Sequence, residues 1–190
     1  MAYYLKPFNL APKPDTTHLF LAEGEAEVGF IEAYLNELQA DAKTNTILCF
    51  EGLSKVHGHS KTLAKIIAGQ PGGLDRIRAI GLMADADNNP TGRIDLIIEC
   101  ATAFGFPKSA QKLREGGRCE VNGRKFCFAL SPSKDREGNI ETLILGEIGK
   151  TPIFECLGQS FACIEKLGTA LLQPPFRLRI ATRLPTMNPR

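Results

Sequence analysis

The chain has 190 residues, of which 43% are apolar and 23% are charged, and its formal net charge is +2. These values are typical of one globular domain with added segments, and they exclude a largely disordered chain. No run approaches the roughly 20 apolar residues that cross a bilayer, and no charged N-terminal segment precedes an apolar run, so we expect a cytoplasmic protein without a membrane partner.

Three short apolar runs, each followed by a segment with helical periodicity, predict alternating strands and helices. The predicted strands are residues 18–22, 46–50 and 79–84. The predicted helices are residues 25–40, about 60–68, and a third helix that has Pro90 near its start. This alternation predicts an α/β fold with a mostly parallel sheet and helices on both faces. A proline-bearing lead-in, residues 1–16, is expected to rest on this domain without being one of its elements.

The chain after the third helix departs from this alternation. Residues 119–121 and 125–130 flank Asn122-Gly123, which is the strongest short hairpin signal in the chain and predicts a β-hairpin at one edge of the sheet. From Asn139 onward the pattern is helical, with apolar residues at near-helical spacing between Ile153 and Ile164.

The expected domain therefore covers residues 17–170, with a core at 17–106 and a hairpin and helical extension at 107–170. The tail at 171–190 is locally basic, because it contains Arg177, Arg179, Arg183 and Arg190 and no acidic residue. Two roles for this tail stay open: contact with a nucleic-acid backbone, or solubility of an exposed end.

The six cysteines are expected to be reduced core residues. They form no CxxC pair, and most lie within apolar patterns, where a thiol acts as a small apolar side chain. Cys119 and Cys127 flank the Asn122-Gly123 turn, but a two-residue turn would place Cys119 opposite Phe126. A disulfide across the hairpin is therefore out of register.

Two acidic clusters follow the first and third predicted strands. Leu-Ala-Glu-Gly-Glu-Ala-Glu occupies residues 21–27, and Met-Ala-Asp-Ala-Asp-Asn-Asn occupies residues 83–89. In open α/β sheets such strand ends hold the sites, so Glu23, Glu27, Asp85 and Asp87 are expected to converge at one sheet edge. Four carboxylates repel one another unless a cation lies between them, and oxygen ligands suit Mg²⁺, Mn²⁺ or Ca²⁺ better than zinc. The pattern predicts a Mg²⁺ or Mn²⁺ site. Alternatively, the glutamates only favour a helix N-terminus and the aspartates only cap the next helix.

These residues carry a resemblance to a known family. Glu-Gly-x-x-Glu after a first strand and Asp-x-Asp after a third resemble the Toprim domain of topoisomerases, primases and overcoming-lysogenization-defect nucleases, across residues 17–106. Glu27, where topoisomerases and primases often carry aspartate, is closer to the nuclease branch. The whole chain, including residues 138–145, more closely resembles small stand-alone Toprim-like proteins of unassigned function. The resemblance implies that Asp85 and Asp87 are metal ligands, that Glu23 is a general acid/base or shared ligand, that Glu27 completes a second metal position, and that Glu141 is a further ligand.

The activity implied by this resemblance is metal-dependent cleavage of a phosphodiester bond in nucleic acid or a nucleotide. A topoisomerase is not expected, because the tyrosines lie only in the lead-in and the first helix. The sequence contains neither a P-loop nor a zinc ribbon, so the protein would need a partner or act alone on small substrates. One alternative is a non-catalytic metal- or nucleotide-binding module, or a partner subunit of a defence or repair system. Another is an aspartate-based phosphatase of the haloacid-dehalogenase type, although the nucleophile of those enzymes usually follows the first strand.

Several basic side chains are weaker candidates for binding substrate phosphate. His57 and His59 flank Gly58 in a predicted loop after the second strand, near the crevice, where either could hold a phosphate or assist proton transfer. Further cations expected near the metal are Lys55, Lys61 and Arg93. The alternative is a solvated loop with Ser60 as the N-cap of the next helix, and cations that lie on the surface only.

Overall fold

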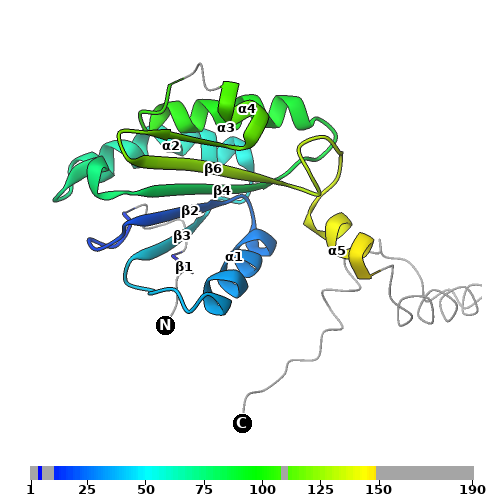
Figure 1. Ribbon diagram of the computed structural model, residues 1–190, viewed down its shortest axis with the longest axis horizontal. Helices are drawn as coiled ribbons and strands as arrows, with labels where there is room; N and C mark the ends of the chain where they lie inside the picture. Colours follow the sequence, from blue (N-terminus) through cyan, green and yellow to red (C-terminus); the bar gives the residue numbers. More distant parts are fainter. Residues whose placement is uncertain (1–3, 6–10, 108–110, 149–190) are drawn as a thin grey trace, which may run out of the picture. The chain divides into compact units, whose positions relative to one another are not determined.

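The computed structural model describes residues 4–5, 11–107 and 111–148, and the chain divides into two compact units, Met1–Ile140 and Glu141–Arg190. The first unit contains a six-stranded sheet of order β1-β3-β2-β4-β6-β5 (Figure 1). The described part of the second unit is helix α5 (Ile140–Ile148) from Glu141 onward. The predicted boundary near residue 170, the apolar pattern at 153–164 and the basic tail lie outside the described residues.

The sheet is mostly parallel, which confirms the predicted α/β class. The parallel strands are β1 (Tyr4–Leu5), β3 (Asn45–Cys49), β2 (His18–Ala22), β4 (Ala79–Asp85) and β6 (Arg124–Ser131). Only β5 (Arg118–Val121) runs antiparallel, against β6 at one edge. All five residues of β3 are buried, because helices cover both faces of a sheet of this kind, and this is why its strands appear in the sequence as apolar runs.

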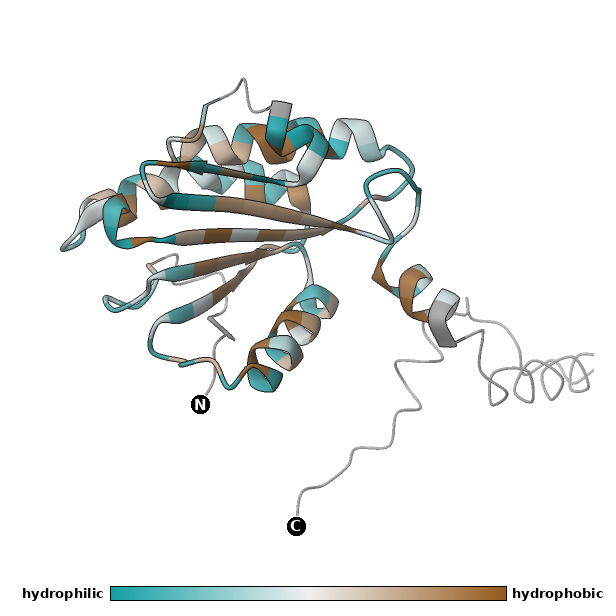
Figure 2. Ribbon diagram, in the orientation of Figure 1, coloured by the Kyte–Doolittle hydropathy of each residue, from teal (hydrophilic) through white to brown (hydrophobic). Residues whose placement is uncertain are grey.

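Helices pack on both faces of this sheet (Figure 1). Helix α1 (Glu25–Glu37) contributes Val28, Ile31 and Leu35 to a smaller apolar cluster, which also contains Met83 of β4. Helices α2 (Leu53–Ala68) and α3 (Pro90–Ala103) contribute to the larger cluster on the other face. The short elements η1 (Gly73–Arg76) and α4 (Gln111–Gly116) complete the unit. Figure 2 shows the hydrophobic residues concentrated along the central strands, as two buried faces require.

The prediction that α2 begins near Ser60 was wrong, because this helix begins seven residues earlier, at Leu53. Gly52 is the N-cap, and buried Leu53, Val56 and Leu63 continue one apolar stripe along the helix. Ser60 does not cap a helix, since it is buried inside α2 and its hydroxyl donates to the carbonyl of Val56 at 2.6 Å. Gly58, which suggested a loop, lies in the helix, where a side chain would meet no atom within 4 Å.

The lead-in was also predicted wrongly in part, because Tyr4 and Leu5 pair with β3 as a sheet strand. The first helix ends at Glu37 and not at residue 40 as predicted. Leu38, which was expected to continue the apolar stripe, is the C-cap residue and is 58% exposed. The other elements of the core begin and end within about two residues of their predicted bounds, within the usual uncertainty of such assignments. No helix in the described parts of the chain combines the length and apolarity that a membrane span requires.

The register of the hairpin matches the prediction, whereas the predicted burial of its cysteines was wrong, because Cys119 is half-buried and Cys127 is exposed. Cys119 lies opposite Phe126 across β5 and β6, and the four cysteines in the described residues are free. Burial raises the pKa of the Cys100 thiol to about 11, so this buried thiol is a poor nucleophile. Cys156 and Cys163 lie outside the described residues.

The direction in which the chain builds the sheet changes between β2 and β4. The strand that follows β2 in the sequence, β3, lies on one side of this pair, and the strand β6 lies on the other side, next to β4. From the end of β2 the chain enters α1 on one face, and from the end of β4 it enters α3 on the opposite face. At such a position the two loops separate and leave a crevice at the carboxyl end of the sheet. Glu23 directly follows β2 and Asp85 ends β4, so the fold brings the two acidic loops to this crevice.

Candidate functional site

The site begins where the pairing between β2 and β4 ends. The last residue pair is Ala22 with Met83, and the backbone N–H of Glu23 still donates to the carbonyl of Met83 at 3.0 Å. Two residues further along β4, the backbone of Asp85 has no strand residue opposite it on the β2 side. The Glu23 side chain takes that place, because its Oε2 accepts a hydrogen bond from the Asp85 N–H at 3.0 Å. The two acidic loops therefore meet directly.

Arg93 of α3 binds both loops. Its Nη2 forms an ion pair with Oε2 of Glu23, and its Nη1 lies 3.2 Å from Oδ2 of Asp87. Its Nε donates to the backbone carbonyl of Asp85 at 2.8 Å. The side chains of Arg93 and Glu23 are each only 15% exposed, which makes their ion pair less screened by water than a surface pair. One guanidinium therefore connects side-chain and backbone groups of residues 23, 85 and 87.

The loop after β6 holds the second acidic loop in place. Asp87 has a positive φ of 49°, and it exchanges two backbone hydrogen bonds of 2.7 Å with Gly138. The Oδ1 atom of Asp85 accepts a hydrogen bond of 2.8 Å from the backbone N–H of Ile140. Both aspartates are thus positioned by residues that lie more than 50 positions later in the sequence.

Helix α3 starts immediately after this loop and determines where Arg93 lies. Asn89 is the N-cap, its Oδ1 accepts from the Gly92 N–H at 3.0 Å, and Pro90 occupies the first turn. Gly92 is needed because a Cβ at that position would lie 2.5 Å from Nδ2 of Asn89. Arg93 follows in the first turn, so its side chain is anchored close to the strand end that it binds.

Glu27 has a different environment. It is only 3% exposed, and its Oε2 lies 3.0 Å from the position that a Cβ on Gly24 would take. Glu27 has an interaction partner, and a buried carboxylate requires one. The structure therefore places Glu27 beside the backbone at the start of α1, and its predicted role as a metal ligand stays a prediction.

The loop after β3 contributes to the same edge of the sheet through its backbone. The N–H of Gly52 donates to the carbonyl of Glu23 at 2.7 Å. Glu51, which has a positive φ of 54°, pairs with Lys55 at 2.9 Å. Lys55 is therefore already paired with a carboxylate of the loop that precedes its helix, and it contacts neither acidic loop in any interaction described.

The two histidines lie on helix α2 and not in a loop as predicted. His57 Nε2 lies 2.7 Å from Oε2 of Glu99 on α3, and the His59 ring stacks on Phe50 at 6.1 Å between ring centroids. Lys61 is an exposed residue of the same helix. The structure therefore brings Arg93 to the acidic loops, whereas it gives both histidines other partners.

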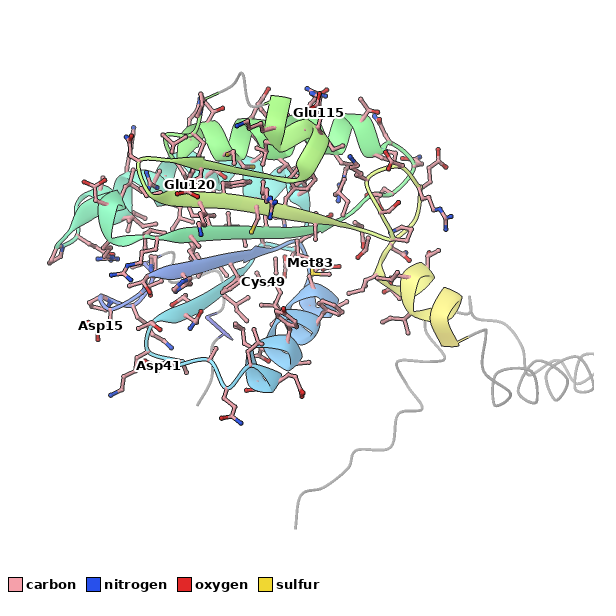
Figure 3. The ribbon with its side chains drawn as sticks, viewed as in Figure 1. Asp15, Asp41, Cys49, Met83, Glu115 and Glu120 are labelled. Atoms are coloured by element: carbon pink, nitrogen blue, oxygen red, sulfur yellow. The ribbon has the colours of Figure 1, made fainter. Side chains whose placement is uncertain are left out.

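Glu141 lies in the first turn of α5 and belongs to the second unit, so its role as a ligand also stays a prediction. Acidic residues also lie at the opposite end of the sheet. Figure 3 labels Asp15 and Asp41, which precede β2 and β3 at the amino ends of these strands, whereas Met83 lies near their carboxyl ends.

The carboxylates match the predicted ion in their chemistry. Glu23, Asp85 and Asp87 supply the oxygen ligands that Mg²⁺ and Mn²⁺ prefer. Their spacing is a different matter, because within the described residues no three His, Cys, Asp or Glu side chains are grouped so as to hold a metal ion. The guanidinium of Arg93 lies between Glu23 and Asp87 instead. The carboxylate oxygens are suitable ligands for a dication, but in the structure they are arranged around the guanidinium of Arg93.

Sequence reasoning assigned Arg93 only to substrate phosphate and missed its contacts with the carboxylates. It also missed the pairing of Asp87 with Gly138. A usable signal for Arg93 was present, since it follows Asp85 by eight residues and falls in the first turn of the helix that starts from the same loop. The signal for Gly138 was weaker, because pairing across 51 residues leaves no local pattern.

One comparison with known proteins identifies a family. The model of a family described as "Protein of unknown function (DUF3226)" matches residues 17–177, which is most of the chain. No curated protein and no solved structure matches the chain.

Proposed function

Since this chain belongs to DUF3226, a family of unknown function, we propose its activity from the site: it binds Mg²⁺ or Mn²⁺ and hydrolyses a phosphodiester bond in nucleic acid or a nucleotide. The observation that carries the proposal is the direct contact between the two acidic loops, in which Oε2 of Glu23 accepts from the N–H of Asp85. This contact lies where open α/β sheets bind their ligands. The Toprim-like order of the motifs supports the same activity.

Each residue has a distinct part in this proposal. Asp85, Asp87 and Glu23 would hold the ion, which when bound stabilises negative charge on the attacking and leaving oxygens. Glu23 would also accept the proton of an attacking water, and the partial exposure of its side chain supports this role. Asp85 is kept in position by the Ile140 N–H, and ligands that are fixed in this way bind metal more tightly.

A cleavage assay tests the proposal. The purified chain is incubated with plasmid DNA, single-stranded DNA and RNA, in Mn²⁺, in Mg²⁺ and in chelator. We expect cleavage of at least one substrate in metal and none in chelator. Asp85→Asn should reduce cleavage by more than about 100-fold, because loss of a direct ligand should cost more than the 10–100-fold that outer-sphere changes cost.

Asp85→Asn is the matched variant because its side-chain oxygen still accepts from the Ile140 N–H, so the loop keeps its anchor while the charge is lost. An unchanged melting temperature shows that the fold is intact. Cleavage that persists in chelator, or that is equal in Asp85→Asn and in the wild type, contradicts the proposal.

The pairing of Arg93 with two carboxylates favours a second candidate. A site whose acids are neutralised by an internal cation suits a non-catalytic metal- or nucleotide-binding module, such as a partner subunit of a defence or repair system. This candidate predicts Mn²⁺ binding by calorimetry without cleavage of any of the three substrates.

A further inference from the structure

Arg93 occupies the position that a metal ion bound by Glu23 and Asp87 would need. Its two terminal nitrogens contact one carboxylate from each acidic loop. A guanidinium is planar, cannot lose its charge in a protein, and binds carboxylates through directed hydrogen bonds. Arg93 contacts Oε2 of Glu23 and Oδ2 of Asp87, so a dication that binds through these oxygens competes with the guanidinium for their lone pairs.

Charge repulsion points in the same direction. A dication within about 5 Å of a guanidinium is repelled by several kcal/mol even at the effective dielectric constant of a protein surface. Because the Arg93 side chain is 15% exposed, solvent screens this repulsion only in part. Metal binding to Glu23 and Asp87 therefore favours departure of Arg93 from the carboxylates.

Arg93 has a second group to bind when it leaves. It lies in the first turn of α3, at the carboxyl edge of the sheet, where the N-terminus of the helix favours anions. Arginine binds phosphate oxygens with the same two-pronged geometry that it uses for carboxylates. The phosphate of a bound substrate supplies such an anion beside the acids.

We propose that Arg93 and the divalent ion are alternative occupants of the acidic crevice: Arg93 neutralises Glu23 and Asp87 in the metal-free protein, and metal binding transfers it to the substrate phosphate. This inference rests on the proposed function and adds a regulation of the same site. Apparent metal affinity is then lower than the carboxylates alone would give, because the ion must first displace the arginine.

Titration calorimetry with Mn²⁺ alone tests the exchange. Arg93→Ala should bind Mn²⁺ about tenfold more tightly than the wild type, because the competing cation is gone. Arg93→Lys retains the charge but lacks the planar guanidinium that reaches the two carboxylates through separate nitrogens, so its affinity should fall between these two. Arg114→Ala is the control, since it also removes one arginine, from an exposed ion pair with Asp95, and should leave affinity unchanged. A purely structural role for Arg93 predicts the opposite sign, because the carboxylates would lose their alignment.

Modification of the wild-type protein provides a test that needs no variant. Phenylglyoxal should modify Arg93 faster when Mn²⁺ is bound, because the guanidinium leaves its carboxylates, whereas the rate at Arg114 should stay constant. Peptide mass mapping measures both rates in one sample.

The outcomes separate this inference from the proposed function. If the wild type binds Mn²⁺ and Arg93→Ala binds it equally or less tightly, the exchange is overturned and the metal site remains. An Arg93 modification rate that Mn²⁺ does not raise overturns the exchange as well. If neither the wild type nor Arg93→Ala binds Mn²⁺ at millimolar concentration, the proposed function and the exchange both fail. If Arg93→Ala binds Mn²⁺ and the wild type does not, the exchange is supported most strongly.

Discussion

The two acidic loops have similar chemistry in the sequence but different environments in the fold. The loop after β2 turns at once into α1, and the third acid of its cluster, Glu27, lies in this helix and is only 3% exposed. The loop after β4 extends past the sheet before α3 begins, and the side chain of its second acid, Asp87, is 52% exposed. A buried carboxylate acts mainly on the stability of the fold, whereas a half-exposed one remains available to a cation or a substrate. Burial therefore distinguishes two acids that the sequence pattern treats alike.

The largest effect should come from comparing these two acids directly. Glu27→Ala should lower the free energy of unfolding by about 2–3 kcal/mol, because the partner of a buried carboxylate is left unsatisfied. Asp87→Ala should lower it by less than about 1 kcal/mol, because an exposed ion pair contributes little. Urea denaturation measures both values.

Glu25→Ala is the control for the first comparison, since Glu25 lies in the same helical turn and is exposed. Equal losses of stability in Glu27→Ala and Asp87→Ala would show that burial does not distinguish the loops.

The backbone that supports Asp87 provides the second test. Gly138 has a φ of 133°, a conformation that strains residues with a side chain, so Gly138→Ala should cost about 1–2 kcal/mol of stability. The same change should loosen Asp87, because the two residues exchange both backbone hydrogen bonds. Gly58→Ala is a control of opposite sign: it lies within α2 and should stabilise the protein by about 0.5–1 kcal/mol. A destabilising Gly58→Ala would contradict the helical assignment of that residue.

The sequence was sufficient to predict the elements that build the crevice. Parallel strands covered on both faces are apolar throughout, and α1 and α3 show an uninterrupted stripe, so these elements could be located from local pattern alone. The start of α2 could not, because Gly58 between two histidines resembles a loop although Leu53 and Val56 already belong to the stripe. Strand β1 was missed because two residues are too short to show any periodicity.

The site was predictable only as far as strand order and loop position determine it. The meeting of Glu23 with Asp85 follows from two neighbouring parallel strands, of which β4 extends two residues beyond the last pair with β2. The burial of Glu27 and the placement of Arg93 between the loops depend on side-chain packing within the first turns of α1 and α3. Such packing has no periodic signal, so acidic residues at correct spacing suggested a metal cluster where the structure shows an arginine between two carboxylates.

The start of α3 provides a third test, which concerns how precisely Arg93 is positioned. Gly92→Ala should cost about 1 kcal/mol, because its Cβ displaces the Asn89 side chain and removes the N-cap. Asn89→Ala should cost a similar amount alone. In the double variant the clash no longer exists, so the combined loss should be clearly smaller than the sum of the two single losses. Additive losses, measured by thermal and urea unfolding, would show that the two residues do not act through one contact.

The smallest effect is expected in α2, and it asks whether this helix contributes to the crevice. His57 contacts Glu99 on α3 at 2.7 Å, and the two side chains are 37% and 51% exposed. A surface pair of this kind contributes little, so His57→Ala should change the free energy of unfolding by no more than about 0.5 kcal/mol. Its Mn²⁺ affinity should equal that of the wild type, since the described contacts of His57 are with α3 and not with the acidic loops. A large loss of Mn²⁺ affinity in His57→Ala, with Glu99→Ala unchanged, would instead place this histidine in the site and add α2 to the elements that form the crevice.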